Sequence, residues 1–166
     1  MKFNIFLFLT TVFFLSSCSS DKDETPEIDS STQIEGTWDA TALRIDEDNA
    51  SDDAKFGQQI LEFLTNKDCY IITLTFNGDM AVTAENSSNY LEINATDSGL
   101  DVPCPTESDT ESSVYTYDGS ILTIVDEDGE TVEVNVSIDG DIMVVDAADL
   151  DIPNFDDSGE LIFMRR

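Results

Sequence analysis

Residues 70–84 read YIITLTFNGDMAVTA, and this stretch decides the fold. Apolar and polar side chains alternate on both sides of Asn77-Gly78-Asp79, which is typical of strands that bury one face. An Asn-Gly pair between two such runs is a strong signal for a tight hairpin turn, because both residues tolerate a positive φ. The stretch therefore predicts two adjacent antiparallel strands.

The same arrangement of strand and turn continues toward the C-terminus. Gly119, Gly129 and Gly140 punctuate apolar alternating runs at intervals of ten or eleven residues. Strands joined by such short turns form an antiparallel meander. About eight strands with one apolar face close most easily into a barrel, since closure removes the exposed edges. We therefore expect a mostly all-β protein, built as an antiparallel up-and-down β-barrel of about eight strands.

One segment, residues 54–65, has the spacing of a helix instead. Its apolar side chains are Phe56, Ile60, Leu61, Phe63 and Leu64. They recur at intervals of three and four residues, which places them along one helical face, and Ser51 or Asp53 can cap the first turn. Because an apolar face must be buried, we expect this single helix to pack on the sheet as a lid or plug.

The N-terminus has a different character. An apolar run from Phe3 to Leu15 follows Lys2 and ends in Leu15-Ser16-Ser17-Cys18. The run is too short for an ordinary spanning helix, which needs about 20 residues. The four closing residues resemble the bacterial lipobox, which implies lipid transfer to Cys18, cleavage before it and acylation of the new terminus. An uncleaved anchor is the alternative, but it does not require small residues followed by a Cys.

This resemblance divides the chain into three parts. Residues 1–17 are expected to be a lipoprotein signal peptide, residues 18–33 a flexible acidic tether, and residues 34–166 the folded domain. The tether is too polar to bury a core. Its first residues, 19–24, resemble the Ser/acidic run of lipoproteins carried to the cell surface. We therefore expect an outer-membrane lipoprotein, held by acyl chains such as palmitate and exposed at the cell surface if the second resemblance applies.

The cysteines follow from the same interpretation. If Cys18 carries lipid, Cys69 and Cys104 remain as a pair. An exported protein sits in an oxidising compartment, so a disulfide between them is the default expectation. A metal or redox pair is the alternative, but the chain has no Cys-x-x-Cys and no His.

Charge and composition exclude several classes of function. The chain has 36 acidic and 7 basic residues, a formal net charge of −29, and it should repel nucleic acid and anionic lipid surfaces. Without His there is no Ser-His-Asp triad and no imidazole base. We expect no catalytic residue, no cofactor and no enzyme activity.

Calcium is the one cation that the acidic loops could attract. Residues 46–53 and residues 126–130 are dense in carboxylates, the ligands that this ion prefers. Neither loop fits the Asp-x-Asp-x-Asp-Gly template with a Glu at its twelfth position. We therefore expect hydrated turns and no metal site.

A second resemblance concerns the folded part. Gly36-x-Trp38 in the first strand, the hairpin at residues 74–79 and a late Arg are similar to the lipocalin-like domains of bacterial lipoproteins. Cys69 and Cys104 also match a common variant. In lipocalins the Trp plugs the closed end of the barrel and a late Arg packs across it. The resemblance implies that Gly36 and Trp38 pack there with Arg165 or, as the second choice, Arg166.

The resemblance implies a binding module for a small apolar or amphipathic molecule at the mouth of the barrel, with the helix as a lid. The candidate lining residues are Tyr70, Ile72, Leu74, Met80, Val82, Tyr115 and Tyr117. The alternative is a structural or protein-interaction lipoprotein of the envelope, with a filled barrel, a protein partner and no small ligand.

Overall fold

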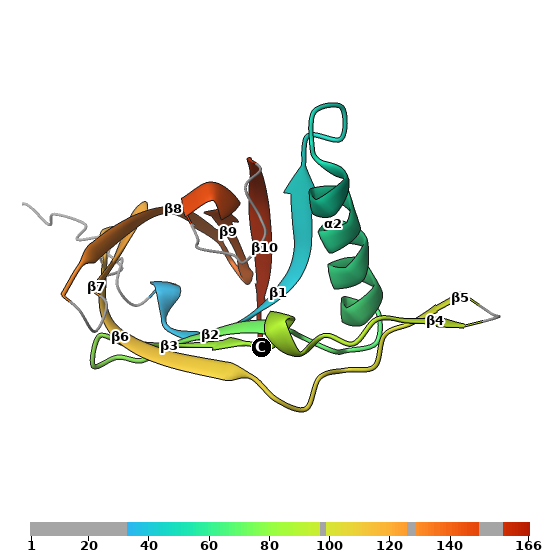
Figure 1. Ribbon diagram of the computed structural model, residues 1–166. Coiled ribbons are helices and arrows are strands. Elements are labelled where there is room, and N and C mark those ends of the chain that lie inside the picture. The colour runs from blue at the N-terminus through green and yellow to red at the C-terminus, as the bar shows by residue number, and fades with distance from the viewer. Residues whose placement is uncertain (1–32, 97–98, 126–128, 150–157) are drawn as a thin grey trace, which may run out of the picture.

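The computed structural model describes residues 33–96, 99–125, 129–149 and 158–166. Eight antiparallel strands form a closed barrel in which every strand pairs with the next barrel strand along the chain, and the last pairs with the first (Figure 1). These strands are β1 (Gly36–Ile45), β2 (Ile72–Phe76), β3 (Ala81–Asn86), β6 (Asp109–Tyr117), β7 (Ile121–Val125), β8 (Thr131–Asp139), β9 (Ile142–Asp146) and β10 (Gly159–Arg165). The predicted up-and-down barrel is confirmed.

The two ends of the barrel differ. We call the end at which β1 begins and β10 ends the closed end, and the opposite end the open end. The short turns after β2, β6 and β8 lie at the closed end, while the longer connections lie at the open end. The Asn77 turn follows the predicted hairpin: Asn77 N–H donates to the Ala81 carbonyl (2.8 Å), and Met80 takes the positive φ of 64°.

Helix α2 (Asp52–Thr65) starts two residues earlier than the sequence predicts. The Ser51 hydroxyl caps it by accepting from the Ala54 N–H (3.1 Å), and two Asp residues in the first turn complement the helix dipole. Its buried residues are Ala54, Ile60, Leu61 and Leu64. Two members of the predicted apolar stripe, Phe56 and Phe63, are instead 41% and 36% exposed.

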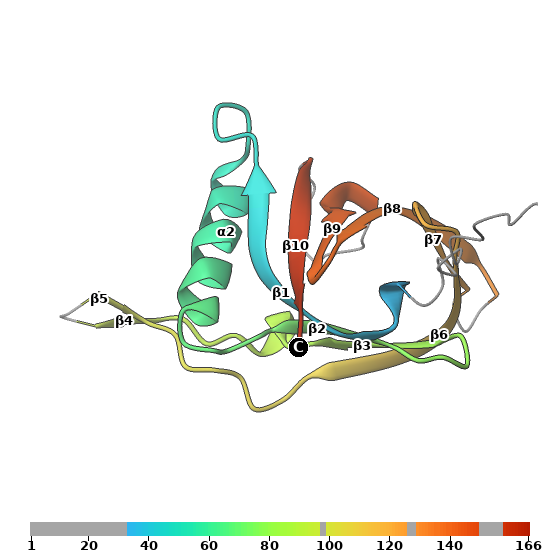
Figure 2. The ribbon, with the colours of Figure 1, turned by 180° about the vertical axis from the view of Figure 1, so that it is seen from behind.

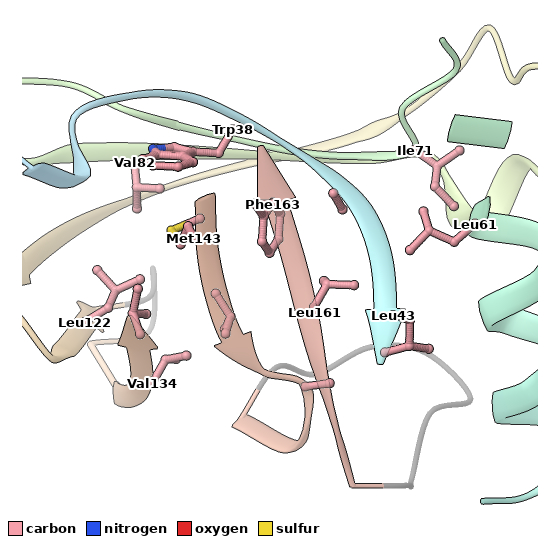
Figure 3. Packing of buried hydrophobic residues seen from close by; sticks show 14 of the residues in the cluster. Trp38, Leu43, Leu61, Ile71, Val82, Leu122, Val134, Met143, Leu161 and Phe163 are labelled. Atoms are coloured by element: carbon pink, nitrogen blue, oxygen red, sulfur yellow. The ribbon is translucent and has the colours of Figure 1, made fainter. Parts of the chain in front are cut away.

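Helix α2 lies alongside β1, as both views of the ribbon show (Figures 1 and 2). Gln58 Nε2 donates to the Leu43 carbonyl (2.8 Å). Figure 3 shows Leu61 against Ile71 on one side of β1, with Phe163 on the other side. The helix therefore packs on the outer side of the barrel wall.

The long connection between β3 and β6 contains three short elements: η1 (Ser88–Tyr90), β4 (Asn94–Thr96) and β5 (Gly99–Asp101). β4 and β5 pair only with each other and project away from the barrel (Figures 1 and 2). The predicted disulfide joins Cys69, just after α2, to Cys104, just after β5, with the two Cα atoms 5.8 Å apart. It ties the projecting connection to the end of the helix.

A last short element, η2 (Ala147–Asp149), follows β9. The Asp149 carboxylate accepts from the backbone N–H and the side-chain amide of Asn135, both at 3.1 Å. This contact holds η2 against β8. In the part of the chain that the structure describes, no helix is both long enough and apolar enough to cross a membrane.

Replacing both half-cystines with Ala should lower the free energy of unfolding by about 4 kcal/mol, because the bond closes a loop of 35 residues in the unfolded chain. Urea denaturation measures the change. A reducing agent should destabilise the unmodified chain by a similar amount and leave the Cys69→Ala/Cys104→Ala variant unaffected. Equal stability of the two proteins would contradict the pairing.

Candidate functional site

The closed end is plugged by Trp38, which has no solvent exposure. Its Nε1–H donates to the Ile34 carbonyl (2.7 Å), and the Arg165 guanidinium stacks on the indole with Cζ 4.0 Å from the ring centroid. Arg165 also donates to the Gln33 carbonyl (2.7 Å) and to the Glu35 carbonyl. The contact with Trp38 adds cation–π attraction to the hydrogen bonds, and of the two arginines considered from the sequence it is Arg165 that makes it.

Gly36 is required at this end for two reasons. Its φ of +121° is a conformation that residues with a side chain rarely adopt. A Cβ placed on it would lie 2.8 Å from Nη1 of Arg165, closer than real Cβ contacts. Gly36 therefore permits the backbone conformation at the start of β1 and leaves the space that the Arg165 guanidinium occupies.

The neighbouring arginine has a separate role on the outside of the barrel. Arg166 donates from Nε and Nη2 to the two carboxylate oxygens of Asp39, at 2.9 and 2.6 Å. Thr73 also donates to this carboxylate (2.8 Å), whose residue is only 4% exposed. Sequence reasoning missed Asp39; the available signal was an acid in a strand that is otherwise largely apolar.

Tyr115 completes the plug beside the hairpin turn. Its ring meets Phe76 edge to face, with 5.0 Å between centroids, and its hydroxyl donates to the Asn77 carbonyl (3.1 Å). Burial raises the pKa of Tyr115, with further contributions from the charges of Glu35 and Asp79. The neutral phenol is therefore the form that the folded barrel favours.

Next to this plug the barrel interior contains a cavity of about 160 Å³. Its described lining residues are Leu74, Phe76, Val82, Ala84, Glu111, Ser113, Leu122, Ile124, Val134, Met143 and Val145. They come from β2, β3 and β6 to β9, and most are apolar. Figure 3 shows Val82, Leu122, Val134 and Met143 gathered in the part of the interior away from α2.

Two rows of cross-strand neighbours line the cavity, one nearer the closed end and one nearer the open end. Leu74, Ala84 and Glu111 stand opposite one another on β2, β3 and β6, and Phe76, Val82 and Ser113 form the next row toward the closed end. Glu111 therefore lies nearer the open end than Ser113 does. The cavity is apolar at depth and carries a carboxylate toward its mouth.

The volume limits what can enter. An apolar cavity of about 150 Å³ holds one benzene molecule, whereas sites for drug-sized ligands occupy about 300–1,000 Å³. The cavity here thus fits one small ring or a short aliphatic group. A long acyl chain would need a wider barrel.

Only some of the candidate lining residues predicted from the sequence lie at the cavity. Leu74 and Val82 line the cavity, and Ile72 is half-buried against the core. Tyr115 and Tyr117 are buried toward the closed end, and Tyr70 is half-buried just before β2. Met80 does not line the interior: it is 57% exposed, because it occupies the hairpin turn itself.

The residues that sequence reasoning missed lie on the far wall. They are Leu122, Ile124, Val134, Met143 and Val145, together with Glu111 and Ser113 on β6. The alternation in each later strand was visible, but it does not say which inward residues leave space between them. The lid prediction for the helix is wrong, since α2 packs outside β1 and no described lining residue comes from it.

Outside the barrel, a more open hollow of about 480 Å³ lies beside the projecting connection, lined by residues 89–92 and 103–107. At its edge the Asp109 carboxylate accepts from the Tyr90 hydroxyl (2.8 Å) and the Asn89 amide (2.9 Å). The Asn89 and Tyr90 hydrogen bonds lower the pKa of Asp109, and the same carboxylate raises the pKa of Tyr90. The hollow is largely polar, and its hydrogen bonds fasten η1 to β6.

Among the described residues, no group of three or more acidic or Cys side chains is arranged to hold a metal ion. In the loop after β1, the Asp46 carboxylate instead accepts from the Asn49 amide (2.6 Å) and the Asp48 N–H (3.2 Å). The second acidic loop, at residues 126–128, lies outside the described residues, as do the signal segment and Cys18.

Comparison with known proteins supports this architecture. A family model of the lipocalin-like domain matches residues 34–145, about two thirds of the chain. The match runs from the residues just before β1 to Val145, one residue before the end of β9. Searches of curated proteins and of solved structures returned no match.

Because Gly36 and Arg165 share one space, their substitutions should not be additive. Gly36→Ala should cost about 2 kcal/mol of stability from backbone strain and crowding, and Arg165→Ala about 2 kcal/mol from lost hydrogen bonds and ring contact. In a double-mutant cycle followed by urea denaturation, the combined loss should be smaller than the sum, since removing the arginine relieves the crowding.

Gly99→Ala is the matched control for this cycle. Gly99 has a similar φ of +123°, but a Cβ there would meet nothing within 4 Å. Its effect should add to that of Arg165→Ala without coupling. Strict additivity for Gly36→Ala as well would contradict the shared space at the closed end.

Proposed function

Because this chain belongs to the lipocalin-like domain family, we propose that its barrel binds a small apolar or amphipathic molecule. The observation that carries this proposal is the apolar cavity of about 160 Å³ enclosed by six of the eight strands. Lipocalin-type barrels of eight strands have room inside for one small ligand. Transfer of an apolar group from water into such a space is favourable by about 25 cal/mol per Å².

The size and lining of the cavity support a compact ligand. A single aromatic ring would contact Leu122, Val134 and Met143, which contribute apolar surface from three strands. We therefore propose a molecule with a body of about one ring, bound by shape and by removal of apolar surface from water. The lipocalin-like fold is generally a binding fold, so we propose binding alone.

The alternative, a barrel that is entirely filled and acts only through protein contacts, has less support. Filling is complete at the closed end, where Trp38 and Phe163 have no exposure. It is incomplete along β2, β3 and β6, where Ala84 and Ser113 face the cavity with small side chains. Small residues at these positions leave the space that a ligand would occupy.

Filling the cavity should abolish binding. Ala84→Phe places a ring inside a space of about one ring, so we expect affinity for small aromatics such as toluene to fall at least roughly tenfold. Titration calorimetry measures the affinity and thermal unfolding checks the fold. The matched control is Ala42→Phe, on an exposed β1 position, which should bind normally. Equal binding by both variants, or none by the unmodified chain, would contradict the proposal.

We also propose that the protein is a lipoprotein anchored in the outer membrane through Cys18. The support is the sequence Leu15-Ser16-Ser17-Cys18 after an apolar run, followed by a polar segment up to residue 33. Several acyl chains give stable anchoring, at about 0.8 kcal/mol per buried methylene. The acidic chain, with a net charge of −29, would gain nothing from an anionic surface.

Cys18→Ala should therefore release the protein from membranes or leave it uncleaved, while the barrel remains folded. Membrane fractionation with metabolic palmitate labelling measures this. Ser19→Ala, one position beyond Cys18, is the control and should be labelled and retained normally. Normal processing and membrane retention of the Cys18→Ala protein would overturn the lipoprotein assignment.

A further inference from the structure

The cavity carries one charged side chain among its described lining residues, the carboxylate of Glu111. Glu111 lies on β6 opposite Ala84, in the cavity row nearer the open end. Ser113, two residues along the same strand, lines the cavity in the next row. Residues two apart on a strand share a face and are separated by about 7 Å, so both oxygen-bearing groups lie on one wall of the cavity.

The basic residues of the described chain lie elsewhere. Arg44 pairs with Glu160, and Lys55 and Lys67 lie on or next to helix α2, Lys67 over the Phe63 ring. Arg165 and Arg166 are engaged at the closed end with Trp38 and Asp39. None of these cations is among the described lining residues, so none of them lines the cavity beside Glu111, which is itself exposed at the mouth.

We propose that the barrel selects a cationic amphipathic molecule, with an apolar body of about one ring and an amine that is protonated at neutral pH. This inference rests on the proposed binding function and specifies its ligand class. The ring would occupy the space lined by Leu122, Val134 and Met143, and the ammonium would point toward Glu111 at the mouth. The Ser113 hydroxyl supplies a second acceptor for its N–H groups.

Electrostatics favour this class over a carboxylate of the same size. An ammonium near Glu111 gains Coulomb attraction, whereas an anion in that place is repelled and has no described cationic partner. The net charge of −29 acts in the same direction, because it concentrates cations around the protein and excludes anions. Fatty acids are therefore disfavoured by charge as well as by length.

Three probes of nearly equal size test the proposal: toluene, benzylamine and benzoate. In titration calorimetry on the full chain, benzylamine should bind best, toluene about fivefold more weakly, and benzoate weakest. Glu111→Gln should remove the preference for benzylamine over toluene while toluene binding stays the same. The substitution keeps the shape of the side chain and deletes only its charge.

The matched control is Glu85→Gln on the neighbouring strand β3. It makes the same change in net charge, but Glu85 follows the inward residue Ala84 and is exposed on the opposite face. It should retain the preference for benzylamine. If toluene binds but benzylamine is not preferred, or if both Gln variants lose the preference equally, the cationic assignment is wrong while the binding function stands. If none of the three probes binds, the binding function itself fails.

Discussion

The pairing of β1 with β10 is the interaction on which the rest of the barrel depends. It joins the first and last strands, so that neither is left as an exposed edge. In its register Trp38 stands opposite Arg165, and this places the guanidinium on the indole. The same arginine then reaches the carbonyls of Gln33 and Glu35 and holds the residues before β1 across the end of the barrel.

The barrel interior is packed at the closed end and contains the cavity toward the open end. At the closed end, large side chains such as Trp38, Phe76 and Tyr115 fill the interior, and the polar atoms of Trp38 and Tyr115 donate hydrogen bonds to backbone carbonyls. Toward the open end, small residues on β3 and β6 leave a cavity. The packed side chains at the closed end bound the cavity on one side, and a preorganised cavity wall favours recognition of a ligand by its shape.

Local sequence predicted much of this architecture because its signals act over short distances. The hairpin at Asn77-Gly78 and the Ser51 cap of α2 each depend on a few adjacent residues. The cavity could not be predicted in the same way, since it depends on how side chains from β2 to β9 leave space between them. Met80 shows the limit: its alternation with Val82 placed it inside, but the turn extends through residue 80 and turns its side chain outward.

The contact between Arg165 and Glu35 also constrains how the chain reaches its native state, because these residues are 130 positions apart in sequence. Contacts of such high sequence separation require most of the chain to be ordered first, and folds rich in them fold slowly. During synthesis, Trp38 can therefore pack against Arg165 only after the last strand, β10, has been made. During that interval β1 has an unsatisfied edge, and the acidic character of the chain provides mutual repulsion that discourages association between incomplete copies.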